Sequence, residues 1–195
     1  MQRSILFIGN SYTYFFDMPE KIFAPMAAAA GHEFEVLSVT HGGYRLSQYA
    51  DPMVEEGQRL REVVQGRHFD CIVLQDHSLS TILDPDAFFA GIHDLKRLLQ
   101  DHTDRFVLYA TWGRKTGCET LQQIGMTNGQ MTEHIARAYA QAGERFGMTV
   151  AHVGRAFAAY ARKYPDAELY YEDLHHSSRL GSTVAAETIL EAIIC

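Results

Sequence analysis

The sequence contains little cysteine and comparatively little positive charge. Only three of its 195 residues are cysteines, Cys71, Cys118 and Cys195, and their spacing fits neither a metal site nor a disulfide framework. Lysine and arginine together number 17 against 24 aspartates and glutamates, which gives a formal net charge of −7. Because a nucleic-acid groove needs a basic face to neutralise phosphates, we expect no nucleic-acid partner.

Long hydrophobic runs are also missing. Hydrophobic residues make up 47% of the chain, yet no apolar stretch reaches the roughly 18 residues that a membrane-spanning helix needs. The sequence opens with a strand-like run and lacks a basic segment followed by a cleavage site. We therefore expect no membrane span and a cytoplasmic location, unless a signal peptide has been removed.

What the chain does contain is an alternation of short apolar runs and amphipathic segments. The runs predict strands at 4–8, 34–39, 70–75, 105–110 and 149–153, and the segments predict helices at 19–30, 53–65, 85–100, 129–146 and 180–193. This order is typical of a three-layer α/β/α sandwich around a parallel sheet of about five strands. No repeat or linker interrupts it, so residues 1–195 are expected to form one domain.

Polar side chains follow the predicted strands, where sheets of this kind bind ligands. Ser11 follows the first strand in "IGNSYT", and "EDLHHSS" near the end of the chain holds Asp173, His175 and His176. A serine nucleophile needs a base, histidine is the usual base, and a carboxylate orients that histidine. The spacing of Asp173 and His176 therefore predicts a triad with Ser11. Ser11 and Asp173 could alternatively serve only as caps of a turn or helix.

Two other strand ends supply candidate donors for the oxyanion of a tetrahedral intermediate. The predicted donors are the N–H groups of Ser11 and Gly43 and the side-chain amide of Gln75, each worth about 3–4 kcal/mol in comparable sites. Gly42 and Gly43 in "THGGYRL" could instead make only a tight turn, and Gln75 in "VLQDHS" could instead cap its strand.

The ordered motifs resemble those of the SGNH hydrolases, also called the GDSL esterase and lipase superfamily. "IGNSYT" is similar to the Gly-Asp-Ser-Leu block, "HGGYRL" to the second block and "DLHHSSRLG" to the Asp-x-x-His block. The resemblance extends from residue 5 to about residue 190 and implies a flavodoxin-like fold. It also implies that Ser11 is the nucleophile, that Gly43 is the oxyanion glycine, and that Asp173 and His176 complete the triad.

Three positions depart from the family pattern. Asn10 replaces the usual aspartate, "VLQDHS" replaces the Gly-x-Asn-Asp block, and Ser177 stands where proline is common. A subgroup of SGNH-like proteins looks similar in having glutamine after this strand, so Gln75 is assigned the role of the missing asparagine. Gly181 falls where one variant of the last block has its glycine.

Weaker candidates lie around these motifs. Tyr12, His77 and Trp112 are candidate substrate-binding residues, although Trp112, the only tryptophan, could equally serve ordinary packing. Segment 113–129 is polar and long for a loop, and long loops near a site are often lids.

The sequence thus predicts a serine esterase that acts on a short-chain acyl ester, with an acetyl group on a carbohydrate suggested by the family resemblance. The expected partner is a small-molecule or glycan ester. Asp173, His175 and His176 could suggest a metal, but no further ligand stands at a recognisable spacing, so we expect no metal and no cofactor. The alternatives are a non-catalytic carbohydrate- or ligand-binding domain on the same fold, and a nucleotide binder, which the single Gly9 in the first loop disfavours.

Overall fold

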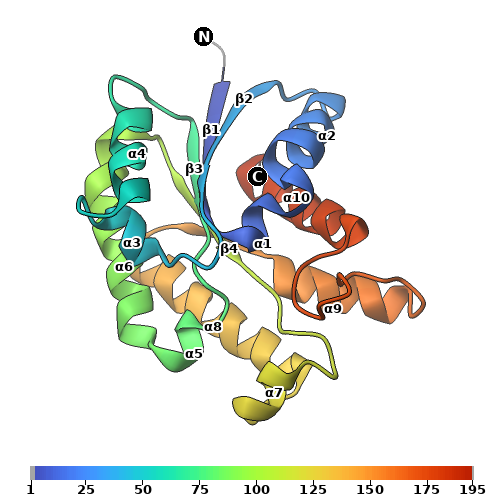
Figure 1. Cartoon of the computed structure of the whole chain (residues 1–195). Coiled ribbons are helices and arrows are strands. Elements are labelled where there is room, and N and C mark those ends of the chain that lie inside the picture. Colours follow the sequence, from blue (N-terminus) through green and yellow to red (C-terminus); the bar gives the residue numbers. More distant parts are fainter. Residues whose placement is uncertain (1–2, 195) are drawn as a thin grey trace.

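The computed structural model describes residues 3–194 and is built around a parallel sheet of five strands. The strands lie in the order β2-β1-β3-β4-β5 (Figure 1). Their bounds are β1 (Arg3–Gly9), β2 (Phe34–Thr40), β3 (Cys71–Leu74), β4 (Phe106–Ala110) and β5 (Thr149–His152). Each strand begins and ends within one residue of its predicted range.

Both faces of the sheet are buried, as the apolar runs predicted. Within β1, Leu6 and Ile8 pack into the core on one face, while Ile5 and Phe7 pack into the core on the other. All four side chains are fully buried. Since side chains alternate between the two faces of a strand, an uninterrupted apolar run is what a doubly covered strand requires.

Helices cover each face and complete the predicted α/β/α sandwich. One face packs against α3 (Leu46–Ala50), α4 (Glu55–Val64), α6 (Pro85–Leu99) and α8 (Asn128–Phe146) (Figure 1). The other face packs against η2 (Met18–Phe23), α2 (Ala24–Ala29), α9 (Val153–Lys163) and α10 (Arg179–Ile194). The predicted helix 19–30 therefore consists of two parts, a π-helical segment (η2) and then α2.

The short helices near the ends of the strands have no counterpart in the predicted elements. They are α1 (Ser11–Tyr14), η1 (Phe15–Asp17), α5 (Ser80–Leu83), η3 (Gln100–His102) and α7 (Glu119–Gln123), and α3 is of the same kind. Segments of three to five residues are too short to show helical periodicity. Segment 113–129, predicted as a loop, contains α7 and the first residues of α8.

Two of the cysteines lie within the described residues. Cys71 is buried in β3, where burial raises the pKa of its thiol to about 12. Cys118 is half-buried at the start of α7, and Cys195 lies outside the described residues. Among residues 3–194, no helix is both long enough and apolar enough to cross a membrane.

Candidate active site

Asn10 fixes the chain where β1 gives way to α1. Its side-chain oxygen accepts a hydrogen bond from the N–H of Tyr12 at 3.1 Å and so caps the helix. Its side-chain nitrogen donates to the carbonyl oxygen of Tyr44 at 2.9 Å. A carboxylate could not make this second bond, which gives the departure from the family's aspartate a physical reason. Ser11 thereby becomes the first residue of α1, at the end of the strand.

Gln75 supports this turn from behind and does not line the site. Its side-chain oxygen accepts from the N–H of Asn10 and from the hydroxyl of Thr13, both at 2.8 Å, and its nitrogen donates to the carbonyl oxygen of Asp76. Gln75 is fully buried. The structure therefore contradicts the prediction that its amide faces an oxyanion, because both ends of the amide are engaged inside the protein. It favours the alternative in which Gln75 caps and bonds a loop.

The structure brings Ser11, His176 and Asp173 into one continuous chain of hydrogen bonds. The Nε2 atom of His176 lies 2.7 Å from the Oγ atom of Ser11, and its Nδ1 atom lies 2.7 Å from an oxygen of Asp173. A carboxylate can only accept, so Nδ1 carries the ring proton and Nε2 of the neutral ring is left to accept from the serine hydroxyl. This arrangement can take a proton from Ser11 as the serine attacks a carbonyl carbon.

Asp173 is held in its ionised form. Burial raises the pKa of this carboxyl group, but hydrogen bonds from the His176 ring and from the N–H groups of His175 and His176 outweigh burial and bring the pKa to about 2. These N–H groups lie 3.0 and 2.9 Å from the second carboxylate oxygen. The ring of Phe15 stacks on the ring of His176 with centroids 4.3 Å apart and planes 5° apart. The base is therefore fixed by hydrogen bonds in its plane and by stacking on its face.

The loop that carries Asp173 and His176 is tied to the loop after β4. The indole nitrogen of Trp112 donates to the carbonyl oxygen of His175 at 2.9 Å. The N–H of Lys115 donates to the carbonyl oxygen of Leu174 at 2.8 Å. Leu174 has a φ of 65°, which is unfavourable for a branched side chain. The carboxylate and the base are therefore positioned by a turn that the neighbouring loop holds in a strained form.

Gly43 lies in the loop next to the turn of Ser11. It has a φ of 75°, the left-handed region that favours glycine. The N–H of neighbouring His41 donates to the carbonyl oxygen of Gly9 at 3.2 Å, and Tyr44 accepts from Asn10, so both sides of Gly43 are fastened to the first loop. Within residues 3–194, neither the N–H of Gly43 nor that of Ser11 has a hydrogen-bond acceptor. Both groups are free to donate to a ligand.

Tyr12 and Trp112 form the buried support of the site. Tyr12 is 5% exposed and Trp112 is fully buried. Their rings stack with centroids 4.9 Å apart, and Trp112 stacks on Phe157 with centroids 4.3 Å apart. The prediction that they contact substrate is wrong, because no face of either ring is left for a ligand. For Trp112 the packing alternative holds.

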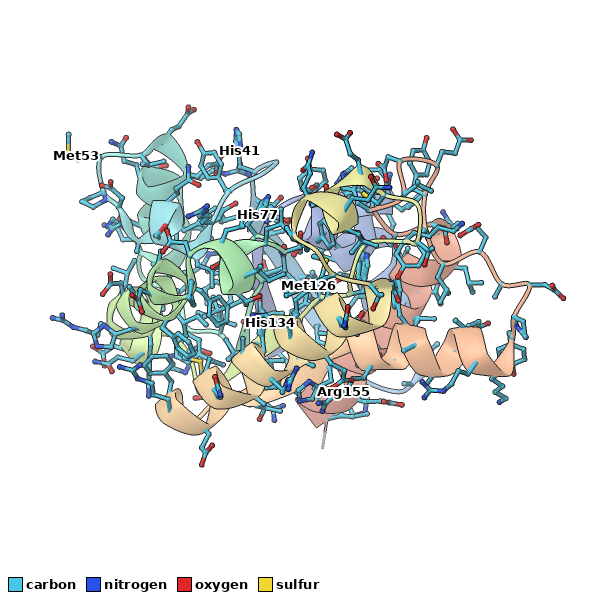
Figure 2. The ribbon with its side chains drawn as sticks, turned by 90° about the horizontal axis from the view of Figure 1, so that it is seen from below. His41, Met53, His77, Met126, His134 and Arg155 are labelled. Atoms are coloured by element: carbon cyan, nitrogen blue, oxygen red, sulfur yellow. The ribbon has the colours of Figure 1, made fainter. Side chains whose placement is uncertain are left out.

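His77 is half-buried and lies near the centre of the molecule when it is viewed toward the carboxyl ends of the strands, whereas His41 lies nearer the edge (Figure 2). The Nδ1 atom of His77 accepts a hydrogen bond from the N–H of Leu79 at 3.3 Å. Burial lowers the pKa of His77, and the charges of Arg114 and Arg45 lower it further. The neutral ring with an accepting Nδ1 carries its proton on Nε2, so His77 can donate a hydrogen bond from that atom.

In the part of the chain that the structure describes, Asp173, His175 and His176 form a group that could hold a metal ion. One ligand atom from each lies within 4.8 Å of the others. Both ring nitrogens of His176 already contact Asp173 and Ser11. A metal on His176 would have to break one of these two contacts, and the donor set therefore fits the hydrogen-bond chain better than it fits a metal.

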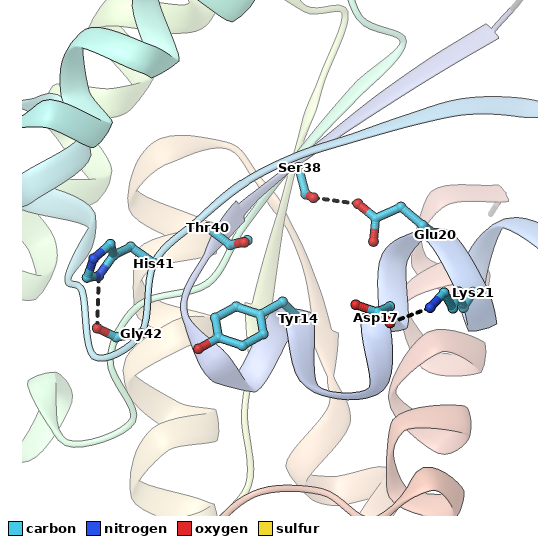
Figure 3. A pocket seen from close by; sticks show the side chains of 8 residues that line it. All are labelled: Tyr14, Asp17, Glu20, Lys21, Ser38, Thr40, His41 and Gly42. Atoms are coloured by element: carbon cyan, nitrogen blue, oxygen red, sulfur yellow. Dashed lines mark hydrogen bonds and ion pairs between the residues drawn. The ribbon is translucent and has the colours of Figure 1, made fainter.

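A polar cavity of about 600 Å³ opens beside the loop of Gly43 (Figure 3). Tyr14 lies between the loop of His41 and the acidic side of the cavity. Asp17 pairs with Lys21 at 2.7 Å, and Ser38 donates to Glu20 at 2.5 Å. The lining is completed by Thr40 and Gly42. These hydroxyl, carboxylate and aromatic groups suit a ligand that carries hydroxyl groups.

Two residues of the site were missed by sequence reasoning. Phe15 stacks on the base, but nothing in the sequence distinguishes it from its aromatic neighbours Tyr14 and Phe16. Arg114 belongs to the strand-end stretch "TWGRK", in which only the tryptophan was singled out. Arg114 stands four residues beyond the predicted strand 105–110, and only the structure shows that it is buried without a charged partner.

Comparison with solved structures identifies the fold of the chain. A protein from Slackia heliotrinireducens described as an SGNH hydrolase superimposes with a TM-score of 0.85 and 28% identity, over 99% of this chain and 100% of that chain. The chain has the SGNH hydrolase fold. The resemblance drawn from its motifs is thereby confirmed at the level of the superfamily. No family model matches the sequence, and no curated protein matches it.

Other solved structures with lower sequence identity share the fold. A DUF4886 family protein from Bacteroides uniformis has a TM-score of 0.81 and 19% identity, over 99% of this chain and 83% of that chain. The acetylxylan esterase Axe2 from Geobacillus stearothermophilus has a TM-score of 0.71 and 15% identity, over 98% of this chain and 94% of that chain. At such identities the likeness shows the fold alone.

Proposed function

We propose that this chain is a serine esterase that hydrolyses a short-chain acyl ester. The observation that carries the proposal is the unbroken chain of hydrogen bonds from Asp173 through His176 to Ser11, with both contacts of the ring at 2.7 Å. A non-catalytic binding domain would not need these three groups to be aligned. The SGNH fold of the chain supports hydrolysis as the reaction class.

The reaction proceeds in two halves. The Oγ atom of Ser11 attacks the ester carbonyl carbon while Nε2 of His176 takes the hydroxyl proton, and Asp173 stabilises the imidazolium that forms. The tetrahedral intermediate collapses when His176 gives that proton to the departing alcohol, which leaves an acyl group on Ser11. A water molecule then attacks the acyl group with His176 again as the base, and Ser11 is released.

The oxyanion is stabilised by the free N–H groups of Ser11 and Gly43. Each such donor lowers the barrier by about 3–4 kcal/mol in comparable sites. Gly43 reaches this position because its positive φ turns its N–H while the flanking residues stay bonded to the first loop. Gln75 acts indirectly, by holding the N–H of Asn10 and thus the turn that presents Ser11.

The polar cavity beside Gly43 supports an alcohol part that carries hydroxyl groups, such as a sugar (Figure 3). It shares the loop of His41 and Gly42 with the proposed oxyanion donor. A sugar could donate to Glu20 and stack on Tyr14. An acetyl group on a carbohydrate is therefore the substrate we favour.

The test is hydrolysis of 4-nitrophenyl acetate, butyrate and octanoate, and of an acetylated sugar, by the wild type and by Ser11→Ala. Circular dichroism checks that both proteins are folded. We expect the wild type to favour the shorter acyl chains and the variant to lose about a thousandfold or more of kcat/KM. A folded wild type without activity on any ester would instead favour a carbohydrate- or ligand-binding domain.

A further inference from the structure

Arg114 is a buried arginine without a charged partner. Its exposed fraction is 8%, and none of the ion pairs within residues 3–194 involves it. Its Nε atom is buried without any acceptor, and its one hydrogen bond, from Nη2 to the hydroxyl of Ser78, is long at 3.4 Å. Arg61 also lacks a carboxylate, but it donates to the carbonyl oxygens of Gly57 and Ala50 at 2.7 Å. Arg114 has no such carbonyl partners.

The backbone around Arg114 is fixed on both sides. The N–H of Arg114 donates to the sulfur of Met131 at 3.4 Å, and its carbonyl oxygen accepts from Asn128 at 2.8 Å. The N–H of Lys115 donates to Leu174 in the loop of the triad. These bonds fix the backbone from which the side chain of Arg114 starts, and the residue as a whole is only 8% exposed.

Arg114 adjoins two loops around the proposed triad, the loop of Ser78 through its side chain and the loop of Leu174 through the N–H of Lys115. Ser78, its hydrogen-bond partner, follows His77 directly. Burial is the main cause that lowers the pKa values of His77 and His175, and the charge of Arg114 lowers both further. Arg114 follows β4, Ser11 follows β1 and Gly43 follows β2. Since β2 and β4 lie on opposite sides of β1 in the sheet, Arg114 and the Gly43 loop approach Ser11 from opposite sides.

A buried charge without a partner opposes folding, because it loses its water and gains nothing in return. A carboxylate brought by a substrate would supply the partner that Arg114 lacks within the described residues. The planar guanidinium fork matches the two oxygens of a carboxylate, to which it can donate two parallel hydrogen bonds.

We infer that Arg114 binds a carboxylate group of the substrate, so that the preferred ester carries a carboxylate close to its carbonyl group. For the reaction this inference rests on the proposed function, and it adds the chemical class of the substrate. The carboxylate can belong to the acyl part, as in a half-ester of a short dicarboxylic acid. It can also belong to the alcohol part, as in an acetylated hydroxy acid, and an acetylated sugar acid would join this inference to the carbohydrate ester proposed above.

The experiment compares matched anionic and neutral esters. Ethyl hydrogen succinate is paired with ethyl butyrate for the acyl part, and O-acetyl lactate with O-acetyl lactamide for the alcohol part. We expect the wild type to favour the anionic member of one pair. Arg114→Met should lower kcat/KM for that ester by roughly tenfold to a hundredfold and should lower kcat/KM for the neutral ester far less. Arg114→Lys is expected to retain part of the preference. Arg155→Met, which removes an exposed arginine paired with Glu133 at 3.0 Å, is the control and should change neither rate (Figure 2).

Two further measurements separate this inference from the proposed function. Thermal unfolding of Arg114→Met should give a Tm no lower than that of the wild type, because the variant removes an unpaired buried charge. Calorimetric titration with succinate should show binding to Ser11→Ala and at least about tenfold weaker binding to Ser11→Ala/Arg114→Met. If no ester is hydrolysed, the esterase proposal fails, while this titration still tests Arg114.

The inference is overturned by either of two results. One is a wild type that shows no preference for either anionic ester and binds succinate no more tightly than the Arg114→Met variant. The other is an Arg114→Met variant with a much lower Tm and equal losses on anionic and neutral esters, which would make Arg114 a structural residue.

Discussion

Replacing Asp173 by asparagine should reverse the direction of the hydrogen bonds at the proposed base. In the wild type, one oxygen of Asp173 accepts from the His176 ring at 2.7 Å and the other accepts from two backbone N–H groups at 3.0 and 2.9 Å. The asparagine oxygen can keep the two backbone bonds, which turns its NH₂ group toward Nδ1. Nδ1 must then accept, so the ring proton moves to Nε2 and His176 can no longer receive the proton of Ser11.

The expected loss in kcat is about 10⁴-fold, the loss that the same change causes in a Ser-His-Asp protease. The effect on stability should be much smaller. The pKa of Asp173 is about 2, so the ionised group stabilises the fold above about pH 4 and this contribution is lost as the pH falls from about 4 to about 2. The shift from the ordinary value of 3.8 to about 2 corresponds to at most about 2.5 kcal/mol. Because the side chain is 31% exposed, solvent reduces that figure to about 1 kcal/mol.

The assay is hydrolysis of 4-nitrophenyl acetate, together with thermal unfolding and the ¹⁵N NMR signals of the His176 ring, which report its tautomer. Asp104→Asn is the matched control, because Asp104 makes the same kind of contact to His68 at 2.8 Å on an exposed surface. It should leave kcat unchanged. A folded Asp173→Asn variant with wild-type kcat, or a large loss of kcat without a change of tautomer, would refute the reasoning.

Three further predictions concern the support of the site. Gly181→Ala should lower stability by about 1–3 kcal/mol in thermal unfolding, because the new Cβ would lie 2.2 Å from the carbonyl oxygen of Leu169. The control Gly129→Ala should be neutral or slightly stabilising, because its new Cβ would meet nothing within 4 Å. Equal effects of the two variants would contradict the predicted clash at Gly181. Gln75→Leu should lower stability by about 1–3 kcal/mol and also lower kcat, because it leaves two buried donors of the Ser11 turn without an acceptor. A free energy of unfolding equal to that of the wild type would show that these bonds are unimportant. Burial raises the pKa of Asp76 to about 6, so the wild type should lose stability through this group as the pH rises from about 4 to about 6. Over that range the free energy of unfolding of Asp76→Asn should rise by up to about 3 kcal/mol relative to that of the wild type. Chemical unfolding at pH 4 and pH 7 measures the difference between the two proteins, and a difference that stays constant would contradict the raised pKa.

The fold could be predicted because its strands are covered on both faces. Runs such as residues 4–8 must be apolar throughout when both faces are buried, and they therefore stand out from the amphipathic segments between them. The same logic located the candidate site. Ser11 and Gly43 follow strands that are neighbours in the sheet, so their meeting follows from the topology alone.

The direction in which a side chain points could not be predicted in the same way. Gln75, Tyr12 and Trp112 all stand at strand ends, yet each turns inward and supports the site from behind. An amide or an aromatic ring can serve either role, and only the three-dimensional packing decides between them. Arg114 shows the opposite error, since a buried unpaired arginine is recognisable only once its surroundings are known.

The central claim is that Ser11 is the nucleophile, and covalent labelling tests it most directly. The protein is treated with a fluorophosphonate that carries a reporter group, and the labelled peptide is identified by mass spectrometry. The account predicts one label on Ser11, no label on Ser11→Ala, and greatly slowed labelling of His176→Ala. A folded wild type that remains unlabelled, or that is labelled at another residue such as Ser78, would contradict it.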